Sequence, residues 1–355
     1  MLKVRITGGA KKGNRAMSEV LKLTDEQKED IYIASGSTHV DLAVETAEAM
    51  GLTLGDDIRK TFPSGEKYFR YGESIRGKHV FAMQSLVESK EGSVNDSLFE
   101  LFLMIDAARR ASASEITVMM PYMAYARQDR KAKGREPISA AATINTLQTL
   151  GASRLVSVDM HSPQTQAVFD GPFDHLTAEG LIRKALKARI DDSHDEFVVV
   201  SPDGGRAKAS EHYAERLGID VLHMPKSRDR KDSSQISRPK TLEGVEGRTA
   251  IMVDDMIDTA GTLVSAAEVL QNSGARGVIT ASTHGVFSNP ALGRLQDSEA
   301  ISEVIITDTL PMYDAKEVLG DRLTVLSSAP MLAKAMAQIA TNGSVSEVFH
   351  GRNYF

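Results

Sequence analysis

The chain has 355 residues, a length for which about two domains are expected. A content of 41% hydrophobic and 25% charged residues is typical of globular proteins and excludes wholesale disorder. The net charge of −6 argues against a nucleic-acid binder that relies on a basic field, and the absence of cysteine excludes disulfides, thiolate metal sites and a cysteine nucleophile. No apolar run approaches the roughly 18 residues of a membrane span, so we expect no membrane partner.

The N-terminal segment is polar and basic. Its first 22 residues contain six basic residues and one acidic residue, Glu19. They lack the apolar region of a secretory signal, and the Gly8-Gly9 pair with weak amphipathicity disfavours the alternative of an organellar transit peptide. We therefore expect residues 1–30 to be a polar basic extension on a cytoplasmic protein.

From Ile31 onward, short β-branched runs alternate with longer stretches of helical periodicity. This alternation is typical of βαβ units, in which helices cover both faces of a parallel sheet. The pattern predicts an α/β fold with mainly parallel sheets flanked by helices. The predicted strands lie at 31–34, 80–83, 116–120, 155–158, 197–200, 220–223, 249–253, 277–281 and 303–307.

Two stretches of the chain resemble each other. Residues 75–83 and 245–253 both read as a short turn followed by a strand, and each precedes a helix and another strand. Two similar α/β halves, joined near residues 174–181, would explain this, and chance similarity between two βαβ units is the alternative. The first strand leads into Gln84-Ser85 and the second into Asp254-Asp255, so only the second half would carry an acidic site.

The strongest motif for chemistry follows the strand at 249–253. Asp254 and Asp255 end the strand, and small residues then lead into a helix at Leu263. Backbone N–H groups at a helix N-terminus bind phosphate, and carboxylates accept hydrogen bonds from sugar hydroxyls. An acidic N-cap is the alternative, but a cap needs only one acid. The motif predicts a sugar-phosphate site formed by Asp254, Asp255, Asp258, Thr259, Ala260, Gly261 and Thr262.

This motif resembles the phosphoribosyl-binding signature of type I phosphoribosyltransferases and ribose-phosphate pyrophosphokinases. Three further segments, at 121–137, 158–166 and 200–206, are similar to the flag loop, the metal-binding segment and the pyrophosphate loop of the pyrophosphokinases. Because the resemblance is colinear from Ile33 to Met336, it implies two domains of the type I phosphoribosyltransferase fold. The implied domains are 31–177, completed by 337–355, and 178–336.

The resemblance assigns nucleotide binding to two segments. Five cations lie between Arg127 and Arg135, in a stretch without apolar periodicity that should project into solvent. Guanidinium groups suit a polyphosphate, although a solvated loop or a nucleic-acid patch fits these residues equally well. The segment 62–66 resembles the adenine-contacting turn, with Ser64 where the family usually has Asp or Asn; a core role for Phe62 is the alternative. The implied ATP-binding residues are Phe62, Ser64, Gly65, Glu66, Arg127 and Gln128.

The segments after two further strands are assigned to metal and pyrophosphate. The resemblance implies that His161 and Asp203 hold Mg²⁺, which usually takes only one or two protein ligands besides phosphate oxygens and water. A hydrogen-bonded structural histidine is the alternative for His161. The resemblance also implies that Asp203, Gly204, Gly205 and Arg206 bind the transferred pyrophosphate, with the glycine pair one residue earlier than is common in the family.

The polar run at 226–234 resembles the family's catalytic loop. Lys226 and Arg228 would close over the transferring group and neutralise developing charge, and Arg228 would also contact ribose 5-phosphate. The proline-rich stretch that normally follows is absent, and an exposed charged linker is the alternative.

The resemblance implies a complete reaction. ATP and ribose 5-phosphate would give AMP and 5-phosphoribosyl 1-pyrophosphate, with Mg²⁺ as cofactor, in a cytoplasmic homo-oligomer that is a hexamer by resemblance. Neither nucleic acid nor membrane is expected as a partner. One alternative is a phosphoribosyltransferase, which needs neither Arg127 nor Lys226. The other is a catalytically silent regulatory subunit, which should have lost such residues.

Overall fold

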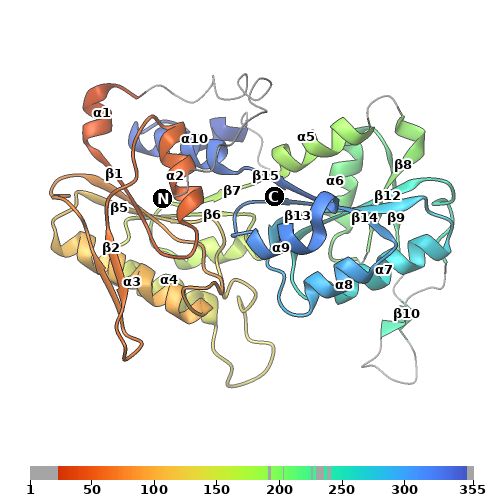
Figure 1. The fold of residues 1–355 in the computed structure, drawn as a ribbon, viewed down its shortest axis with the longest axis horizontal. Helices are drawn as coiled ribbons and strands as arrows, with labels where there is room; N and C mark the ends of the chain where they lie inside the picture. The colour runs from red at the N-terminus through yellow and green to blue at the C-terminus, as the bar shows by residue number, and fades with distance from the viewer. Residues whose placement is uncertain are drawn as a thin grey trace, which may run out of the picture.

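The protein consists of two α/β halves that lie side by side along its long axis (Figure 1). The computed structural model describes residues 23–190, 193–202, 204–224 and 241–349, with two short strands at 227–228 and 236–237. Each half is built on one parallel sheet flanked by helices, which confirms the predicted fold class. Within the described residues, no helix is both long and apolar enough to cross a membrane.

The first half contains a five-stranded parallel sheet in the order β1-β4-β5-β6-β7. Its strand residues are almost fully buried, as expected when helices cover both faces. A separate two-stranded hairpin, β2–β3, extends from this half. The strands are β1 (Ile31–Ser35), β2 (Ile58–Thr61), β3 (Lys67–Arg70), β4 (His79–Met83), β5 (Glu115–Met120), β6 (Arg154–Val158) and β7 (Phe173–Leu176).

The second half contains a six-stranded parallel sheet in the order β15-β14-β13-β12-β8-β9. Its two central strands, β12 and β13, have nine residues each and pair as far as Ile257 and Gly285. The strand predicted to end at Val253 therefore continues through both aspartates, because an equally long neighbour pairs with it. The strands are β8 (Phe197–Ser201), β9 (Asp220–His223), β10 (Ser227–Arg228), β11 (Ile236–Ser237), β12 (Thr249–Ile257), β13 (Gly277–Gly285), β14 (Ile301–Thr307) and β15 (Leu323–Leu326).

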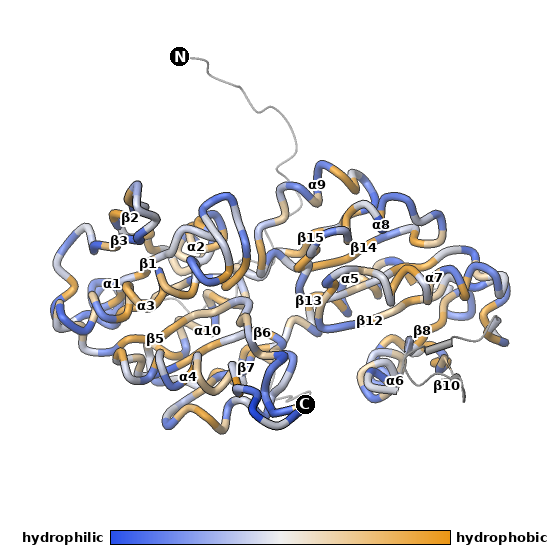
Figure 2. Tube along the Cα trace, turned by 90° about the horizontal axis from the view of Figure 1, so that it is seen from below, coloured by the Kyte–Doolittle hydropathy of each residue, from blue (hydrophilic) through white to orange (hydrophobic). Residues whose placement is uncertain are grey.

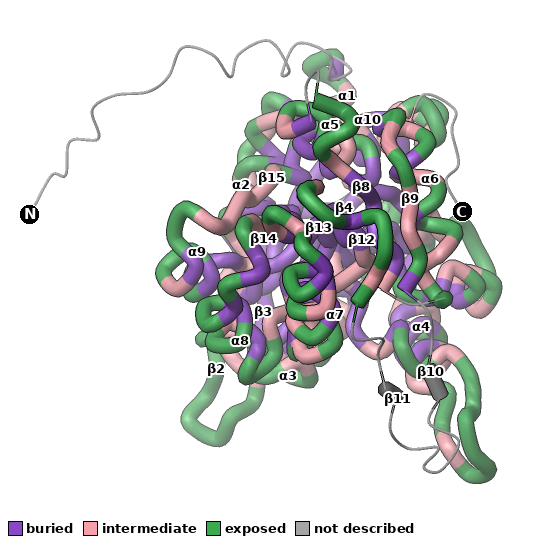
Figure 3. The backbone as a smooth tube through the Cα atoms, turned by 90° about the vertical axis from the view of Figure 1, so that its right-hand side faces the viewer, coloured by how far each residue is buried: buried purple, intermediate pink, exposed green. Residues whose placement is uncertain are grey.

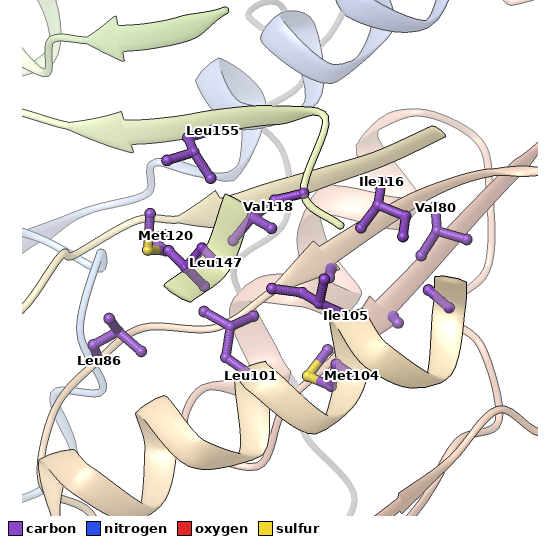
Figure 4. Packing of buried hydrophobic residues seen from close by; sticks show 14 of the residues in the cluster. Val80, Leu86, Leu101, Met104, Ile105, Ile116, Val118, Met120, Leu147 and Leu155 are labelled. Carbon is purple, nitrogen blue, oxygen red and sulfur yellow. The ribbon is translucent and has the colours of Figure 1, made fainter. Parts of the chain in front are cut away.

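The helices bury apolar residues against both faces of each sheet. Figure 4 shows this for α3, whose Leu101, Met104 and Ile105 pack against Val80 and Val118 of the first sheet. Hydrophobic residues follow the central strands (Figure 2), and the buried positions concentrate there (Figure 3). The α-helices are α1 (Asp25–Glu29), α2 (Val40–Ala49), α3 (Val94–Arg110), α4 (Ser139–Leu150), α5 (Glu179–Ile190), α6 (Ala207–Leu217), α7 (Gly261–Asn272), α8 (Ala291–Asp297), α9 (Tyr313–Leu319) and α10 (Ala329–Ala340).

The last helix of each half packs on the sheet of the other half. Helix α5 follows β7 of the first sheet, yet its Ile182 and Leu186 belong to a core cluster of the second sheet. Helix α10 follows β15 of the second sheet, yet its Leu332 and Met336 pack with strands of the first sheet and with α2. The predicted domain boundaries stay a prediction, and the one between residues 336 and 337 falls within α10.

Candidate functional site

The carboxyl ends of strands from both sheets meet at a cavity of about 540 Å³. Strands β6 and β7 reach it from the first half, and β8, β12 and β13 reach it from the second half. Ligands of open parallel sheets bind at this edge, so the position is the expected one for a site. Its lining includes His161, Gly205, Arg206, Lys208, Asp254 and Asp255.

Three strand ends bring four of the predicted residues into direct contact. The Arg206 Nε atom, after β8, lies 2.6 Å from Asp254 Oδ1, and the same guanidinium pairs with Asp255. The His161 Nδ1 atom, after β6, lies 2.7 Å from Asp255 Oδ2. Asp255 therefore accepts from a cation of its own half and from an imidazole of the other half.

The two neighbouring aspartates differ in acidity. Burial raises the pKa of Asp254 to about 7, against the opposing effect of Arg206. Burial also acts on Asp255, but hydrogen bonds from His161 and Arg206 outweigh it and hold the pKa of that carboxyl well below its usual range. Adjacent carboxylates in a buried site separate in this way because both cannot ionise freely. Asp255 is thus the charged anchor of the pair near neutral pH.

The segment between β12 and α7 has the backbone geometry of an anion cradle. Ala260 adopts a left-handed conformation with φ 58°, and no side chain caps the helix that begins at Gly261. The first N–H groups of α7 are therefore not satisfied by a cap, which leaves them available to a ligand. The Arg294 Nη1 atom donates to Thr259 O at 2.9 Å, and a Cβ atom at Gly261 would meet that nitrogen at 2.9 Å.

The basic loop after β5 reaches this cradle through one residue. The Arg127 Nη1 atom lies 2.5 Å from Asp258 Oδ2, so the ion pair joins the two halves. Burial opposes ionisation of Asp258, but hydrogen bonds from Ser288 and Arg127 still lower its pKa. Gln128 accepts a hydrogen bond from Ser139 at the start of α4 instead. The structure therefore brings Arg127 to the sugar-phosphate motif but gives Gln128 a different partner.

The predicted adenine-contacting turn lies apart from the cavity. Residues 62–66 form the tip of the β2–β3 hairpin, in which Phe62 N donates to Glu66 O and the Ser64 hydroxyl donates to Glu66. Phe62 is 46% exposed and touches only Tyr68 edge to face among the described aromatic rings, so it is not a core residue. Figure 1 places the hairpin on the side of the first half that faces away from β12. The chain's own fold does not bring Phe62, Ser64, Gly65 and Glu66 to the site.

Several of the predicted site residues are not among the residues that the structure describes. Asp203 and Lys226 are not among the described residues, and of Arg228 only the backbone is described, paired with Ile236 between β10 and β11. Gly204 and Gly205 are exposed in the turn between β8 and α6. Ligand roles for these residues stay predictions.

The cavity also contains residues to which the sequence analysis assigned no role. Asp159 has a φ of 36°, and its Oδ2 accepts from Ala178 N at 2.8 Å and from the Thr283 hydroxyl at 2.6 Å. The His175 Nε2 atom accepts from Met160 N at 2.7 Å, and burial lowers the pKa of this histidine to about 4. Asp159 could have been assigned to the site because it lies two residues before His161 in the sequence. His175 and Thr283 belong to no motif, so the sequence offered no such signal for them.

The donor set fits a sparsely held divalent cation. Among the described side chains, no group of three or more His, Asp or Glu lies close enough to hold a metal ion. Magnesium needs no such cage, because nucleotide phosphates and water supply most of its ligands. His161 and the carboxylates beside it are compatible with that arrangement.

Comparison with known proteins identifies similar chains over nearly the whole length. Residues 31–151 match the model described as the N-terminal domain of ribose phosphate pyrophosphokinase, and residues 235–350 match the phosphoribosyl synthetase-associated domain. Ribose-phosphate pyrophosphokinase of Bifidobacterium longum is 40% identical over 94% of this chain and 98% of its own length. The Streptomyces coelicolor protein of the same name is 42% identical over 93% of this chain and 98% of its own length.

A solved structure resembles both halves together. The crystal structure of phosphoribosylpyrophosphate synthetase from Mycobacterium smegmatis superposes with a TM-score of 0.80 at 39% sequence identity. The superposition covers 88% of this chain and 100% of the other. The similarity therefore extends to the arrangement of both sheets.

Proposed function

Since the chain belongs to the ribose-phosphate pyrophosphokinase family, we propose that it transfers the β,γ-pyrophosphoryl group of ATP to the C1 hydroxyl of ribose 5-phosphate. The products are AMP and 5-phosphoribosyl 1-pyrophosphate. The C1 oxygen attacks the β-phosphorus, the bond from that phosphorus to the oxygen between the α- and β-phosphates breaks, AMP leaves with this oxygen, and the hydroxyl proton passes to solvent. The observation that carries this proposal is the contact of His161 with Asp255, which joins a nucleotide-side residue to a sugar-side residue.

The second half holds the sugar phosphate. The uncapped N–H groups at the start of α7, within residues 258–262, bind the 5-phosphate with support from the helix dipole. Asp254 and Asp255 orient the ribose hydroxyls, and Arg206 keeps both carboxylates in place. Sugar and phosphate are thus fixed by one continuous segment.

The first half, together with Lys226 and Arg228 of the second half, holds the nucleotide. Arg127 contacts the phosphates from across the cleft, where it already reaches Asp258. Lys226 and Arg228 stabilise charge that develops as the pyrophosphoryl group moves. Pyrophosphoryl transfer depends on positioning and electrostatics, which is consistent with a site rich in cations and without a cysteine nucleophile.

A homo-oligomer completes the adenine site in this proposal. Phe62 is exposed, and the β2–β3 hairpin that carries the 62–66 turn lies on the side of the first half away from β12 (Figure 1). A second copy that places this hairpin at the first copy's cavity supplies the aromatic face and the polar groups that recognise adenine. A hexamer and a cytoplasmic location belong to the same proposal.

Magnesium is the proposed cofactor, held by His161 and Asp203. When bound with ATP, it would neutralise phosphate charge. The chain's own contribution is to place the imidazole of His161, with its Nδ1 fixed by Asp255, at the edge of the cavity.

AMP release is the decisive measurement. With ATP, ribose 5-phosphate and Mg²⁺ present, we expect AMP and 5-phosphoribosyl 1-pyrophosphate in equal amounts, and no AMP when either ribose 5-phosphate or Mg²⁺ is omitted. A phosphoribosyltransferase would instead consume 5-phosphoribosyl 1-pyrophosphate with a base. Absence of AMP at saturating substrates would reject the proposal and favour a regulatory subunit.

A further inference from the structure

Two buried side chains of β13 reach across the joint between the halves. Thr283 and His284 are 3% and 1% exposed. The Thr283 hydroxyl donates to Asp159 Oδ2 at 2.6 Å, and His284 Nε2 lies 3.0 Å from Val158 O. The two acceptors, Val158 and Asp159, are the last residue of β6 and the residue after it. The two hydrogen bonds therefore connect the two sheets at one place.

The chemistry of the partners fixes the orientation of His284. A carbonyl oxygen can only accept, so Nε2 carries the hydrogen and donates to Val158. The Nδ1 atom then accepts from the Thr309 hydroxyl at 2.8 Å. The ring of Tyr122 packs edge to face against this imidazole, with 4.9 Å between the two ring centroids.

The contacts of Thr283 and His284 lie next to both Asp255 and His161. In the β12–β13 register, Asp254 pairs with Ser282 and Met256 pairs with His284, so Thr283 stands beside Asp255. On the other side, Asp159 is two residues before His161. Asp159 is itself held rigidly, because its N–H donates to Leu176 O at 2.8 Å and its carboxylate accepts from Ala178 N.

We propose that Thr283 and His284 are positioning residues that hold His161 against Asp255 across the joint between the halves. Thr283 borders the cavity, but its hydroxyl is engaged by Asp159, and His284 lies behind the lining. They fix the distance between the sugar-side carboxylates of β12 and the imidazole that follows β6, and the catalytic consequence rests on the function proposed above. A displacement of about 1 Å between positioned groups can cost about 100-fold in rate.

Position distinguishes these contacts from the other contacts between the halves. His39 Nε2 lies 2.8 Å from Asp308 O, which also joins the halves. Neither residue lines the candidate cavity. Loss of a contact there should affect stability alone, whereas loss of the Thr283 contact should affect the site.

The test compares three variants of one strand. Thr283→Val removes the hydroxyl at nearly constant volume, and Thr283→Ser keeps it. Thr280→Val is the matched control, because Thr280 is 1% exposed on the same strand and its hydroxyl has no partner among the described residues. We expect T283V to lower kcat/KM for Mg-ATP about 10- to 100-fold, with a higher Mg²⁺ requirement and with KM for ribose 5-phosphate changed less than threefold. T283S should recover most of the loss and T280V should match the wild type.

A second measurement does not depend on turnover. Diethyl pyrocarbonate modifies accessible imidazoles, and the His161 side chain is 40% exposed. Peptide mass spectrometry should show His161 modified several-fold faster in T283V than in wild type or T280V, because the imidazole is no longer held at Asp255. His284→Gln, which retains a donor, should show a smaller increase.

The outcomes separate the two proposals. If the wild type forms no AMP, the function fails, and the modification rates still decide the positioning role. If T283V matches the wild type in both modification and Mg-ATP kinetics, or if T280V falls by as much as T283V, the positioning role is rejected.

Discussion

The two halves of the chain share a framework but differ in chemistry. The first sheet has the order β1-β4-β5-β6-β7, and the second has β8-β12-β13-β14-β15 with β9 added beyond β8. The ends of the last two strands of each sheet match as well. Asp159 N, after β6, donates to Leu176 O of β7 at 2.8 Å, and Asp308 N, after β14, donates to Leu326 O of β15 at 3.0 Å. The echo predicted from residues 75–83 and 245–253 thus corresponds to equivalent strands, β4 and β12.

Only one of the two equivalent edges carries the aspartates of the predicted sugar-phosphate motif. Asp254 and Asp255 lie on β12, whereas Gln84 and Ser85 follow β4. The other edge, at the end of β4 in the first sheet, also adjoins a cavity of about 560 Å³. The lining of that cavity contains four acidic residues and one basic residue. Such a lining repels phosphate, so a shared framework does not give a shared function. The acidic residues are Asp41, Glu88, Glu91 and Asp314, and the basic residue is Lys90.

The largest expected effect comes from removing a negative charge at the end of β12. Asp255→Asn removes the anion that Arg206 and His161 both contact. We expect kcat/KM for ribose 5-phosphate to fall about 100-fold or more, the scale of losing one preorganised electrostatic group. Ser85→Ala at the equivalent edge should leave kcat/KM within about threefold. Equal losses in the two variants would mean that both edges serve the reaction.

A smaller effect is expected where the first half reaches into the second. Arg127→Ala removes the guanidinium that lies at Asp258, and KM for ATP should rise about tenfold or more, as for loss of one charge-assisted hydrogen bond. Arg135→Ala, on the same loop and exposed, is the control and should change KM for ATP less than threefold. Similar increases for both would indicate general attraction by the loop rather than a specific contact.

Local signals explain which parts of this comparison could be predicted from the sequence. The strands and the segment 254–262 are contiguous, so their alternation and residue types were sufficient to predict the parallel sheets and the position of the aspartates. The contact between His161 and Asp255 joins residues far apart in the sequence. The family resemblance assigned His161 to the metal and Asp255 to the sugar phosphate, but it did not predict that the two side chains touch. Thr283 and His284 lie in an ordinary buried strand, where nothing in the pattern distinguishes a side chain that crosses to the other half.

The residue pattern alone does not indicate the exchange of helices. Only the family resemblance placed α5, which lies within 178–336, with the second half and residues 337–355 with the first half. Helix α5 has apolar residues at helical spacing, which indicate a buried face but not the sheet that covers it. The choice of sheet depends on contacts such as Arg189, which donates to Glu303 on β14 and to Thr324 on β15. These partners lie more than a hundred residues away along the chain.

The smallest expected effect tests whether that ion pair fastens α5 to the second half. Burial alone would raise the pKa of Glu303, but the hydrogen bonds from Arg189 and Thr324 lower it. Because the folded-state pKa lies below the unfolded value, the stabilisation is present above an ordinary pKa of 4.5 and is lost as the pH falls through the folded-state pKa. We expect Arg189→Met to lower the free energy of unfolding by about 1–2 kcal/mol at pH 7, measured by urea denaturation.

The control for this pair is an exposed ion pair within a single helix. Arg110 pairs with Asp106 within α3 and its side chain is 72% exposed, so Arg110→Met should lower the free energy of unfolding much less than Arg189→Met does. The difference between Arg189→Met and the wild type should shrink below the ordinary pKa of Glu303, since protonation removes the charge that Arg189 binds. A loss for Arg189→Met that is the same at low and neutral pH would show that the arginine stabilises α5 through packing of its stem, and that the exchanged helix is held by its apolar face alone.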